Sequence, residues 1–243
     1  MINVLICNEF YHEQTEENVK KIYPNGIHGA ISDFLGCDDI KVTTVTEYDE
    51  NLNLVPDYGI TDEMLKETDV IMWWGHMRHG EVSDELVEKI HNQILCGMGA
   101  IFLHSAHHSK LFKKLQGTTC NLCWREEARE RLWNIVPAHP IMRGIGDYFD
   151  IEKEEMYGER FEIPKPDELL MIGTYNTGEV FRSACTWQKL NGRVFYLQPG
   201  HESNPIYYMP EIQTILRNAV RWAAPDYRAE ELTCPHVGTI PFE

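Results

Sequence analysis

The sequence predicts an α/β fold with a doubly wound, mostly parallel sheet and an antiparallel extension. In the first half, short apolar runs alternate with amphipathic helical segments, which is typical of parallel strands joined by crossover helices. In the second half, strand-like runs follow one another, and the last two are joined by a turn around Asn191-Gly192. The 243 residues are 43% hydrophobic, which is enough to bury a full core as one domain over residues 1–243.

Four strands are expected in the first half. Residues 2–8 form a continuous apolar run, as in a strand that is buried on both faces. A helix over residues 27–35 should follow, because its apolar residues recur at helical spacing and Gly36 ends it. A second helix should begin after Ser83, a good N-cap, and stop at Gly97. The other three strands are expected at residues 40–46, 69–74 and 100–103.

The second half is richer in strands and ends in a long helix. An amphipathic helix over residues 208–223 should close the domain before Pro225. Residues 225–243 should form a tail that lies as a strap on the surface. The strands are expected at residues 132–136, 169–173, 180–186 and 194–198.

Charge and cysteine usage restrict the class of protein. A net charge of -16 and a pI near 5.1 argue against nucleic acid or an anionic membrane as partner, and favour a neutral or cationic small molecule. No window has the length of a signal sequence or a membrane-spanning helix, and seven scattered cysteines suit a reducing compartment, so we expect a cytoplasmic protein. Cys120 and Cys123 have ligand-like spacing, but a structural zinc site would need a second pair. Homo-oligomerisation stays open.

Histidines follow several of the expected strands. His76 and His79 come after residues 69–74, His104 comes directly after residues 100–103, and His201 follows the last strand. Parallel strands deliver their following loops to one edge of a sheet, so these side chains should converge there. His28, in the first turn of the helix after the first strand, could join from the side. Any one of them alone is more often a packed or solvated side chain than a ligand.

The acidic partner is expected in the charged run at residues 152–159. Most of its carboxylates should be solvated, but Met156 and Tyr157 draw one side inward, so Glu155 is the candidate for the pocket. There it would serve as a metal ligand or as a general acid or base. Imidazole nitrogens with one carboxylate oxygen suit zinc or another divalent metal, which could polarise a carbonyl or activate water. The expected metal ligands are His28, His79, His104 and His201.

Ser105 allows two interpretations. A serine at a strand-to-helix turn, with His201 as its base, would parallel a hydrolase nucleophile, although the flanking residues depart from the Gly-x-Ser-x-Gly pattern. The alternative is that Ser105 caps the helix that begins there.

Aromatic residues are frequent in the same regions, and sugars stack on aromatic rings. Core packing explains most of them equally well, but Tyr157 and Tyr208 are expected to face the pocket. With Ser105 and His76, they are the expected substrate contacts. The aromatic residues concerned are Trp73, Trp74, Tyr157, Trp187, Tyr207 and Tyr208.

Over nearly all of residues 2–224, the chain resembles the ThuA-like family of trehalose-utilisation proteins. The resemblance rests on several segments that are specific together. They are Trp73-Trp74-Gly75-His76 with His79, Gly97-Met98-Gly99 leading into Leu103-His104-Ser105, His139-Pro140-Ile141, Glu154-Glu155-Met156-Tyr157-Gly158-Glu159, Gly178-Glu179-Val180-Phe181-Arg182-Ser183, and Phe195-Tyr196 with Pro199-Gly200-His201-Glu202.

The resemblance implies a three-layer, flavodoxin-like fold of the class I glutamine amidotransferase-like type, with its pocket at the elbow after residue 103. In that wider fold the elbow carries a cysteine, and a His-x-Glu pair from a late strand completes the triad. Here His104 occupies the elbow, and His201-Glu202 is the counterpart with altered spacing. Glutamine hydrolysis by a thiol is therefore not expected, and the histidine favours metal binding or acid/base chemistry.

Together these inferences predict an enzyme of sugar catabolism that acts on a disaccharide or ketosugar. Its catalytic residues would be Glu155, His104, His201 and Glu202, with Glu155 or Glu202 moving a proton in hydrolysis, elimination or isomerisation. A divalent metal, zinc first, is the expected cofactor, and no nucleotide cofactor is expected. The alternatives are a sugar-binding or regulatory module without turnover, and a serine hydrolase that acts through Ser105.

Overall fold

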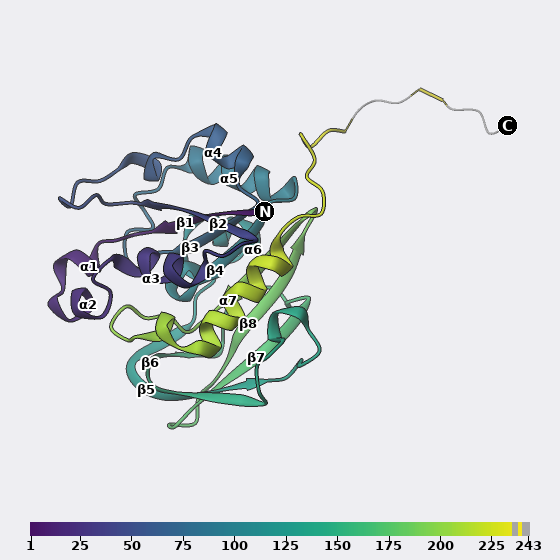
Figure 1. Ribbon diagram of the computed structural model, residues 1–243. Helices are drawn as coiled ribbons and strands as arrows, with labels where there is room; N and C mark the ends of the chain where they lie inside the picture. The colour runs from purple at the N-terminus through teal and green to yellow at the C-terminus, as the bar shows by residue number, and fades with distance from the viewer. Residues whose placement is uncertain (235–237, 240–243) are drawn as a thin grey trace.

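The strands of the protein form one nine-stranded mixed sheet in the order β2-β1-β3-β4-β9-β8-β7-β5-β6. The computed structural model describes residues 1–234 and 238–239 (Figure 1). Four pairings, from β2 to β9, are parallel, and the four from β9 to β6 are antiparallel. The predicted α/β fold with an antiparallel extension is confirmed, and the extension makes as many pairings as the parallel part.

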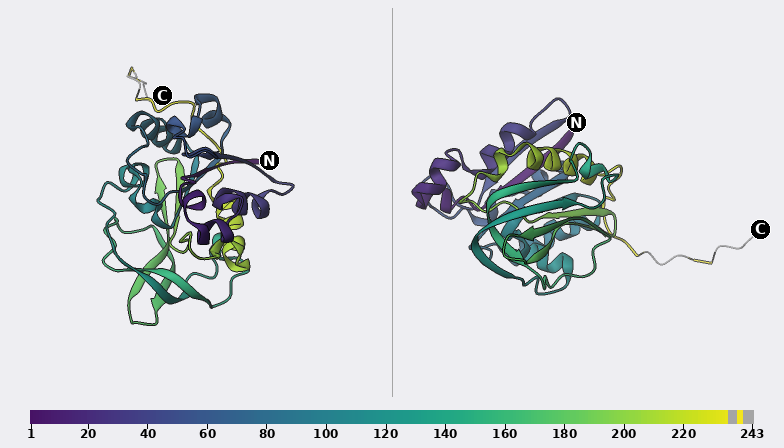
Figure 2. Two further views of the ribbon diagram at one scale, coloured as in Figure 1. Left: turned by 90° about the vertical axis from the view of Figure 1, so that its left-hand side faces the viewer. Right: turned by 90° about the horizontal axis from the view of Figure 1, so that it is seen from below.

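The parallel strands lie between two layers of helices (Figures 1 and 2). Alternate side chains of each strand enter opposite cores, because successive residues of a strand point to opposite faces. Val4 and Ile6 pack with α3 (Gly26–Leu35) and α7 (Pro210–Ala223), and Leu5 packs on the other face with α5 (Asp84–Leu95). The strands are β1 (Ile2–Asn8), β2 (Ile40–Thr46), β3 (Val70–Trp74), β4 (Gly99–Leu103) and β9 (Gly192–Leu197).

The three helices predicted from amphipathic patterns are all present as α3, α5 and α7. Ser83 caps α5 as expected, since its Oγ accepts a hydrogen bond from the backbone N–H of Leu86 at 3.0 Å. Three short helices were not predicted, because four to six residues carry too few turns for a periodic pattern. They are α1 (His12–Thr15), α2 (Glu17–Ile22) and α4 (Asp62–Glu67). The helix expected to begin at Ser105 is α6 (Lys110–Gln116), which starts five residues later.

The antiparallel extension differs most from the prediction. The strand expected at residues 132–136 begins much earlier, at Cys123, and a whole strand within the charged run was missed. Glu152 and Lys153 are exposed on this edge strand, so the run has the composition of a solvated segment. The expectation that Glu154 is solvated was wrong, because it is fully buried. The strands are β5 (Cys123–Asn134), β6 (Tyr148–Gly158), β7 (Glu168–Tyr175) and β8 (Val180–Lys189).

The strand order reverses direction at β1, which pairs with β2 on one side and β3 on the other. The helices that follow β1 and β3 accordingly pack on opposite faces, α3 in one core and α5 in the other. The segments that follow these two strands therefore diverge at the carboxyl ends of the strands. This position is where open α/β sheets bind ligands.

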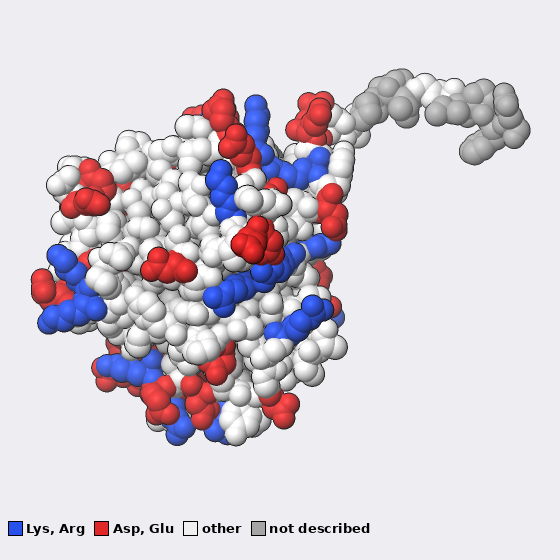
Figure 3. Space-filling view, viewed as in Figure 1, with Lys and Arg blue, Asp and Glu red and all other residues white. Residues whose placement is uncertain are grey.

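Acidic and basic side chains are interspersed on the surface shown in Figure 3. Among the described residues, no helix combines the length and apolarity needed to cross a membrane. The start of the expected tail lies against α4 and α5, where Ala229 donates a backbone hydrogen bond to the carbonyl of Cys96 at 2.8 Å. Residues 235–237 and 240–243 of that tail lie outside the described residues.

Candidate active site at the strand ends

A cavity of about 460 Å³ opens at the carboxyl ends of the parallel strands. The loop after β3 contributes His76, and the short 3-10 helix η2 (His104–His108) after β4 contributes Ser105. The β5–β6 ribbon supplies the opposite wall, which includes Trp124 and Glu155. The site thus joins loops of the parallel half to a wall from the antiparallel half.

His104 forms the sharp turn at the end of β4. Its φ of 50° is left-handed, a conformation that costs a residue other than glycine about 1–3 kcal/mol and is often found at functional sites. The neighbouring Gly200 must lack a side chain, because a Cβ there would overlap the hydroxyl of Tyr207 and lie 3.2 Å from the Cβ of His104. The packing holds the imidazole in place, with Nδ1 2.9 Å from the carbonyl oxygen of Gln198.

The other nitrogen of His104 meets the predicted carboxylate. Nε2 lies 2.9 Å from Oε2 of Glu155 and 3.3 Å from the hydroxyl of Tyr157, whose ring stacks on the imidazole at 4.9 Å. Burial raises the pKa of Glu155, but the hydrogen bond and charge of His104 outweigh it, so the pKa is lowered and the carboxylate is ionised. Both ring nitrogens of His104 face oxygen atoms, which suits a side chain that holds and passes on a proton.

His201 completes this first group. Its Nδ1 accepts a hydrogen bond from the backbone N–H of Ser203 at 3.2 Å, and its ring centroid lies 5.3 Å from that of His104. Burial lowers the pKa of His201 to about 4, although Glu202 opposes this, so the ring is neutral at pH 7. His104, Glu155 and His201 each offer a ligand atom, and these atoms all lie within 4.8 Å of one another.

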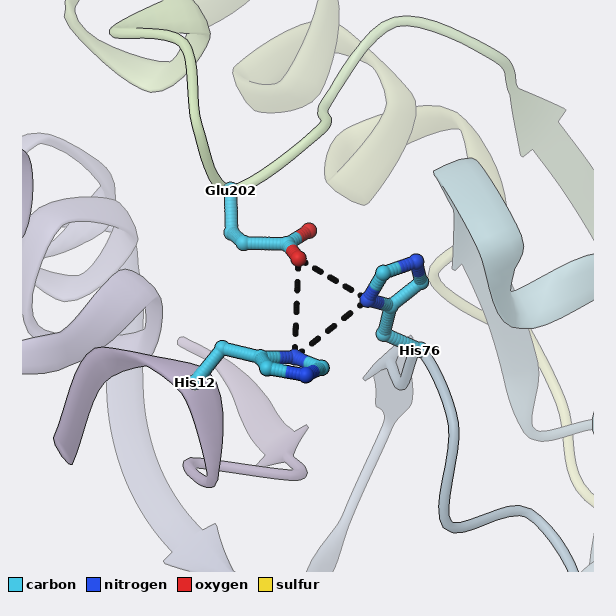
Figure 4. Close-up of side chains that lie close together, drawn as sticks. All are labelled: His12, His76 and Glu202. Carbon is cyan, nitrogen blue, oxygen red and sulfur yellow. Dashed lines mark hydrogen bonds and ion pairs between the residues drawn. The ribbon is translucent and has the colours of Figure 1, made fainter. Parts of the chain in front are cut away.

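A second group lies beside the first and consists of His12, His76 and Glu202 (Figure 4). Oε1 of Glu202 is 2.8 Å from Nδ1 of His76 and 3.5 Å from Nδ1 of His12. Burial alone would lower the pKa of His76, but the hydrogen bond and charge of Glu202 raise it to about 9. Burial alone would raise the pKa of Glu202, but the hydrogen bond and charge of His76 lower it to about 2. In the absence of another cation, this pair is an imidazolium–carboxylate ion pair.

His12 was not among the predicted site residues. It lies in α1, four positions after the end of β1, so its place at a strand end was the available signal. His28, from the same connection, was expected at the site instead. His28 lies apart from both groups, with Nδ1 2.9 Å from Nδ2 of Asn8, and burial lowers its pKa to about 4.

Two other predicted residues also lie apart from the two groups. His79 packs against His108 with ring centroids 6.4 Å apart, and burial lowers its pKa to about 3. Tyr208 stacks on Tyr23 and donates its hydroxyl proton to the carbonyl of Ile22, so its contacts are to the segment before α3. Neither His28 nor His79 belongs to a metal-capable group among the described residues.

Ser105 lines the cavity, as expected for a substrate contact. Its hydroxyl donates to the carbonyl of Gly75 at 2.6 Å, so a backbone oxygen and not a histidine receives that proton. The expectation that Ser105 caps the following helix was wrong, because the chain first makes the 3-10 turn η2. Ser109 is the cap of α6, and its Oγ accepts a hydrogen bond from the N–H of Phe112 at 3.1 Å.

Trp124 is an aromatic residue of the cavity that was not predicted from the sequence. It lines the cavity and is 62% exposed, whereas the tryptophans singled out from sequence are buried in the core. It was not predicted because the first half of β5, in which it lies, was not expected to be a strand. Cys120 is buried and Cys123 exposed, and neither belongs to a metal-capable group among the described residues. The buried aromatic residues are Trp73, Trp74, Trp187 and Tyr207.

Comparison with solved structures shows the same fold in proteins of low sequence identity. A ThuA-like protein from Parabacteroides merdae is 14% identical with a TM-score of 0.67, and the match covers 95% of this chain and 92% of that one. A ThuA-like protein from Bacteroides uniformis is 19% identical with a TM-score of 0.63, and the match covers 91% of each chain. A cytoplasmic protein from Salmonella typhimurium is 12% identical with a TM-score of 0.61, covering 92% and 99%.

The sequence comparison identifies the family directly. None of the curated proteins matches the chain. The family model named ThuA, described as trehalose utilisation, matches residues 3–223. Since this match spans nearly the whole chain, the protein belongs to the ThuA family of trehalose utilisation.

Proposed function

We propose that the protein is an enzyme of sugar utilisation that moves a proton on a bound carbohydrate through Glu155 and His104. The family match supports the sugar-utilisation role. One observation carries the catalytic assignment, the buried contact of 2.9 Å between Glu155 and His104. The two side chains come from different halves of the sheet. An ionised carboxylate beside an imidazole is an acid/base pair of the kind that carries out proton transfer.

The cavity suits a sugar of one or two rings. Its volume of about 460 Å³ lies within the range of roughly 300–1,000 Å³ that is usual for small-molecule sites. Trp124 and Tyr157 supply aromatic surface for the apolar face of a sugar ring, and Glu126 and Glu155 supply acceptors for its hydroxyl groups. We therefore propose a disaccharide or ketosugar as the substrate.

In the proposed reaction, Glu155, which lines the cavity, takes a proton from the substrate and returns it to another atom of the substrate. His104 is fully buried and does not line the cavity, so it acts through Glu155, which it contacts at 2.9 Å and whose proton it can hold between the two steps. With a ketosugar, the hydrogen on the carbon beside the carbonyl is acidic enough for a carboxylate base, which allows elimination or isomerisation. Glu155 fits this role better than Glu202, because Glu202 is engaged with His76 at 2.8 Å and does not line the cavity. His201, neutral at pH 7, does not line the cavity and lies beside His104, so it would act through His104.

A divalent metal, zinc first, remains part of the proposal, since the site offers imidazole and carboxylate ligands. Bound there, it would polarise a carbonyl or hydroxyl oxygen of the sugar. We also propose a cytoplasmic location. Scattered free cysteines, and the description of a similar Salmonella protein as cytoplasmic, support it.

The test is turnover of trehalose and of 3-keto-disaccharides by the purified protein and its variants. Glu155→Gln and His104→Ala should each lower kcat by about 10²- to 10⁴-fold. Trp124→Ala should raise KM more than it lowers kcat, because it removes a stacking surface and no proton-transfer group. Glu152→Gln is the matched control on β6, since Glu152 is exposed, and it should retain the activity of the natural protein.

Other results would favour the alternatives. Binding of sugars without any turnover would overturn the catalytic proposal and leave a sugar-binding module on the same fold. Abolished activity in Ser105→Ala, with Glu155→Gln still active, would support the serine hydrolase instead. We expect Ser105→Ala to remain active, because the hydroxyl is bonded to the carbonyl of Gly75.

A further inference from the structure

We propose that His12, His76 and Glu202 are the three protein ligands of a divalent transition-metal site at the switch point of the sheet. The inference deepens the proposed function and rests on it only for what the metal does, because metal binding can be measured by itself. The ligands come from the loops after β1, β3 and β9, which the topology brings together at one edge (Figure 4). In this arrangement His104 is not a metal ligand and remains available for proton transfer.

The spacing of the three ligand atoms fits a metal. Zinc–nitrogen and zinc–oxygen bonds of about 2.0–2.1 Å in a tetrahedron require ligand atoms to be about 3.3–3.4 Å apart. Here the two Nδ1 atoms are 3.3 Å apart, and they lie 2.8 and 3.5 Å from Oε1 of Glu202. One ion could therefore contact all three atoms after shifts of a few tenths of an ångström.

Hydrogen bonding among the three side chains leaves the group incomplete. Both imidazoles point Nδ1 at the same carboxylate oxygen, so they also point these nitrogens at one another (Figure 4). Only 3% of the Glu202 side chain is exposed, and its Oε2 finds no hydrogen-bond partner among the described residues. A buried, unsatisfied carboxylate oxygen is costly, and a cation would stabilise this carboxylate together with both imidazoles.

Two carboxylates lie beside the proposed ligands, and one of them fixes the loop that carries His76. Oε2 of Glu9 accepts hydrogen bonds from three successive backbone N–H groups, those of His76, Met77 and Arg78, at 2.7, 2.9 and 2.9 Å. Oε1 of Glu16 lies 3.8 Å from Nε2 of His12, the ring nitrogen that faces away from the site. Glu9 thus fixes the backbone of the His76 loop, and Glu16 lies near the nitrogen of His12 that in metal sites takes an outer partner.

The chemistry of the ligands indicates which metals would bind. Two imidazole nitrogens and one carboxylate oxygen suit zinc and its divalent neighbours better than magnesium or calcium, which prefer oxygen ligands. Three protein ligands leave a coordination position for substrate. His76 lines the cavity, so that position can be reached by a sugar oxygen, close to the Glu155–His104 pair.

Metal titration of the full chain tests this inference. The protein is stripped with a chelator and titrated with Zn²⁺ and with Co²⁺, whose visible spectrum reports tetrahedral nitrogen and oxygen ligands. We expect one ion per chain. His12→Ala and Glu202→Gln should each weaken binding by more than the roughly 10- to 100-fold that loss of an outer partner costs. His28→Ala, from outside both groups, should change the affinity only slightly. His201→Ala should cost no more than loss of an outer partner, because Nδ1 of His201 lies 3.8 Å from Oε2 of Glu202.

The outcomes separate the metal site from the proposed function. Loss of binding in His201→Ala with full binding in His12→Ala would overturn the inference and place the metal at the elbow group. No Zn²⁺ or Co²⁺ binding by the natural protein that still converts sugars would overturn it together with the proposed metal, and leave the proposed proton transfer by Glu155 and His104 standing. Metal binding with the expected pattern in the variants, but without sugar turnover, would support the metal site and overturn the proposed function. Circular dichroism of each variant, with His12→Gln as a larger replacement, separates ligand loss from unfolding.

Discussion

Glu130 shows how far burial can raise the pKa of a single side chain. It lies in β5 with no exposed surface, and Oε1 accepts a hydrogen bond from the hydroxyl of Ser183 at 3.2 Å. Burial raises the pKa of Glu130 to about 8, and the hydrogen bonds from Ser183 and Tyr175 only partly oppose it. The folded protein therefore holds this carboxyl as the neutral acid at pH 7.

This protonation makes stability depend on pH. The folded pKa of about 8 exceeds the ordinary value of 4.5, so between these pH values the folded chain holds a proton that the unfolded chain releases. The free energy of unfolding therefore falls as pH rises through this window, and the full stabilisation is present only below it. Glu130→Gln should flatten the dependence by up to about 1.4 kcal/mol per pH unit. Urea unfolding between about pH 5 and pH 8 measures it.

The exposed Glu152→Gln serves as the control and should keep the slope of the natural protein. Equal slopes in Glu130→Gln and the natural protein would show that Glu130 is ionised when folded. Glu47 and Glu154, whose pKa values burial also raises, would contribute slope of the same sign in Glu130→Gln, and buried histidines with lowered pKa values, such as His201, would contribute slope of the opposite sign below about pH 6.5.

Part of the site could be predicted residue by residue. His104, His201 and Glu155 could be singled out because the sequence shows polar residues next to apolar runs. The structure places one ligand atom of each within 4.8 Å of the others. His12 and Trp124 were missed for a physical reason. Their roles depend on a short helix and on a strand with an irregular pattern, and neither has a periodicity that identifies the face on which a side chain lies.

At the scale of elements, the loop between β3 and α5 is held by one carboxylate. Three backbone N–H groups of residues 76–78 point at Glu9, which is itself buried. Glu9→Ala leaves all three without that acceptor, and each hydrogen bond to a charged group contributes about 1.5–3 kcal/mol. We expect faster amide hydrogen exchange at residues 76–78, with little change in the strands.

Glu85→Ala is the comparison for this loop, because Glu85 is exposed in the first turn of the following helix. It should leave exchange at residues 76–78 as it is in the natural protein. Unchanged exchange in Glu9→Ala as well would mean that packing, and not the carboxylate, holds the loop.

Long elements were predictable and short or charged ones were not. The parallel strands and α3, α5 and α7 follow from hydrophobic patterns of several turns or of uninterrupted apolar runs. β6 resembles a solvated segment because its middle is exposed at the sheet edge, while its end is covered by neighbouring parts of the fold. Burial of that end depends on tertiary contacts, which the local sequence does not contain.

At the scale of the whole molecule, the segment after α7 closes one end of the parallel half. The guanidinium of Arg228 donates hydrogen bonds to the carbonyls of Leu65, Lys66 and Thr68 and to Oε1 of Gln93. These carbonyls lie at the C-terminal end of α4, where a positive charge is favourable. Arg228 thus ties the segment that follows α7 to α4 and α5.

Arg228→Ala should lower the free energy of unfolding by about 1–3 kcal/mol, because several carbonyls lose their donor. For a domain of this size, each kcal/mol corresponds to a fall in Tm of about 2–4 °C. Thermal unfolding followed by circular dichroism measures the shift. Tyr227→Ala, at the exposed neighbouring position, is the control, and a similar Tm for both variants would contradict the prediction.

The division of the site between the two halves of the sheet affects how activity can be lost. The histidines are anchored in the parallel half, whereas Glu155 and the aromatic wall belong to the β5–β6 ribbon at the sheet edge. Local opening of this ribbon would carry the carboxylate away from His104 without disturbing the buried strands beneath. Inactivation by heat or denaturant can therefore precede global unfolding, and a spectroscopically folded preparation can be inactive.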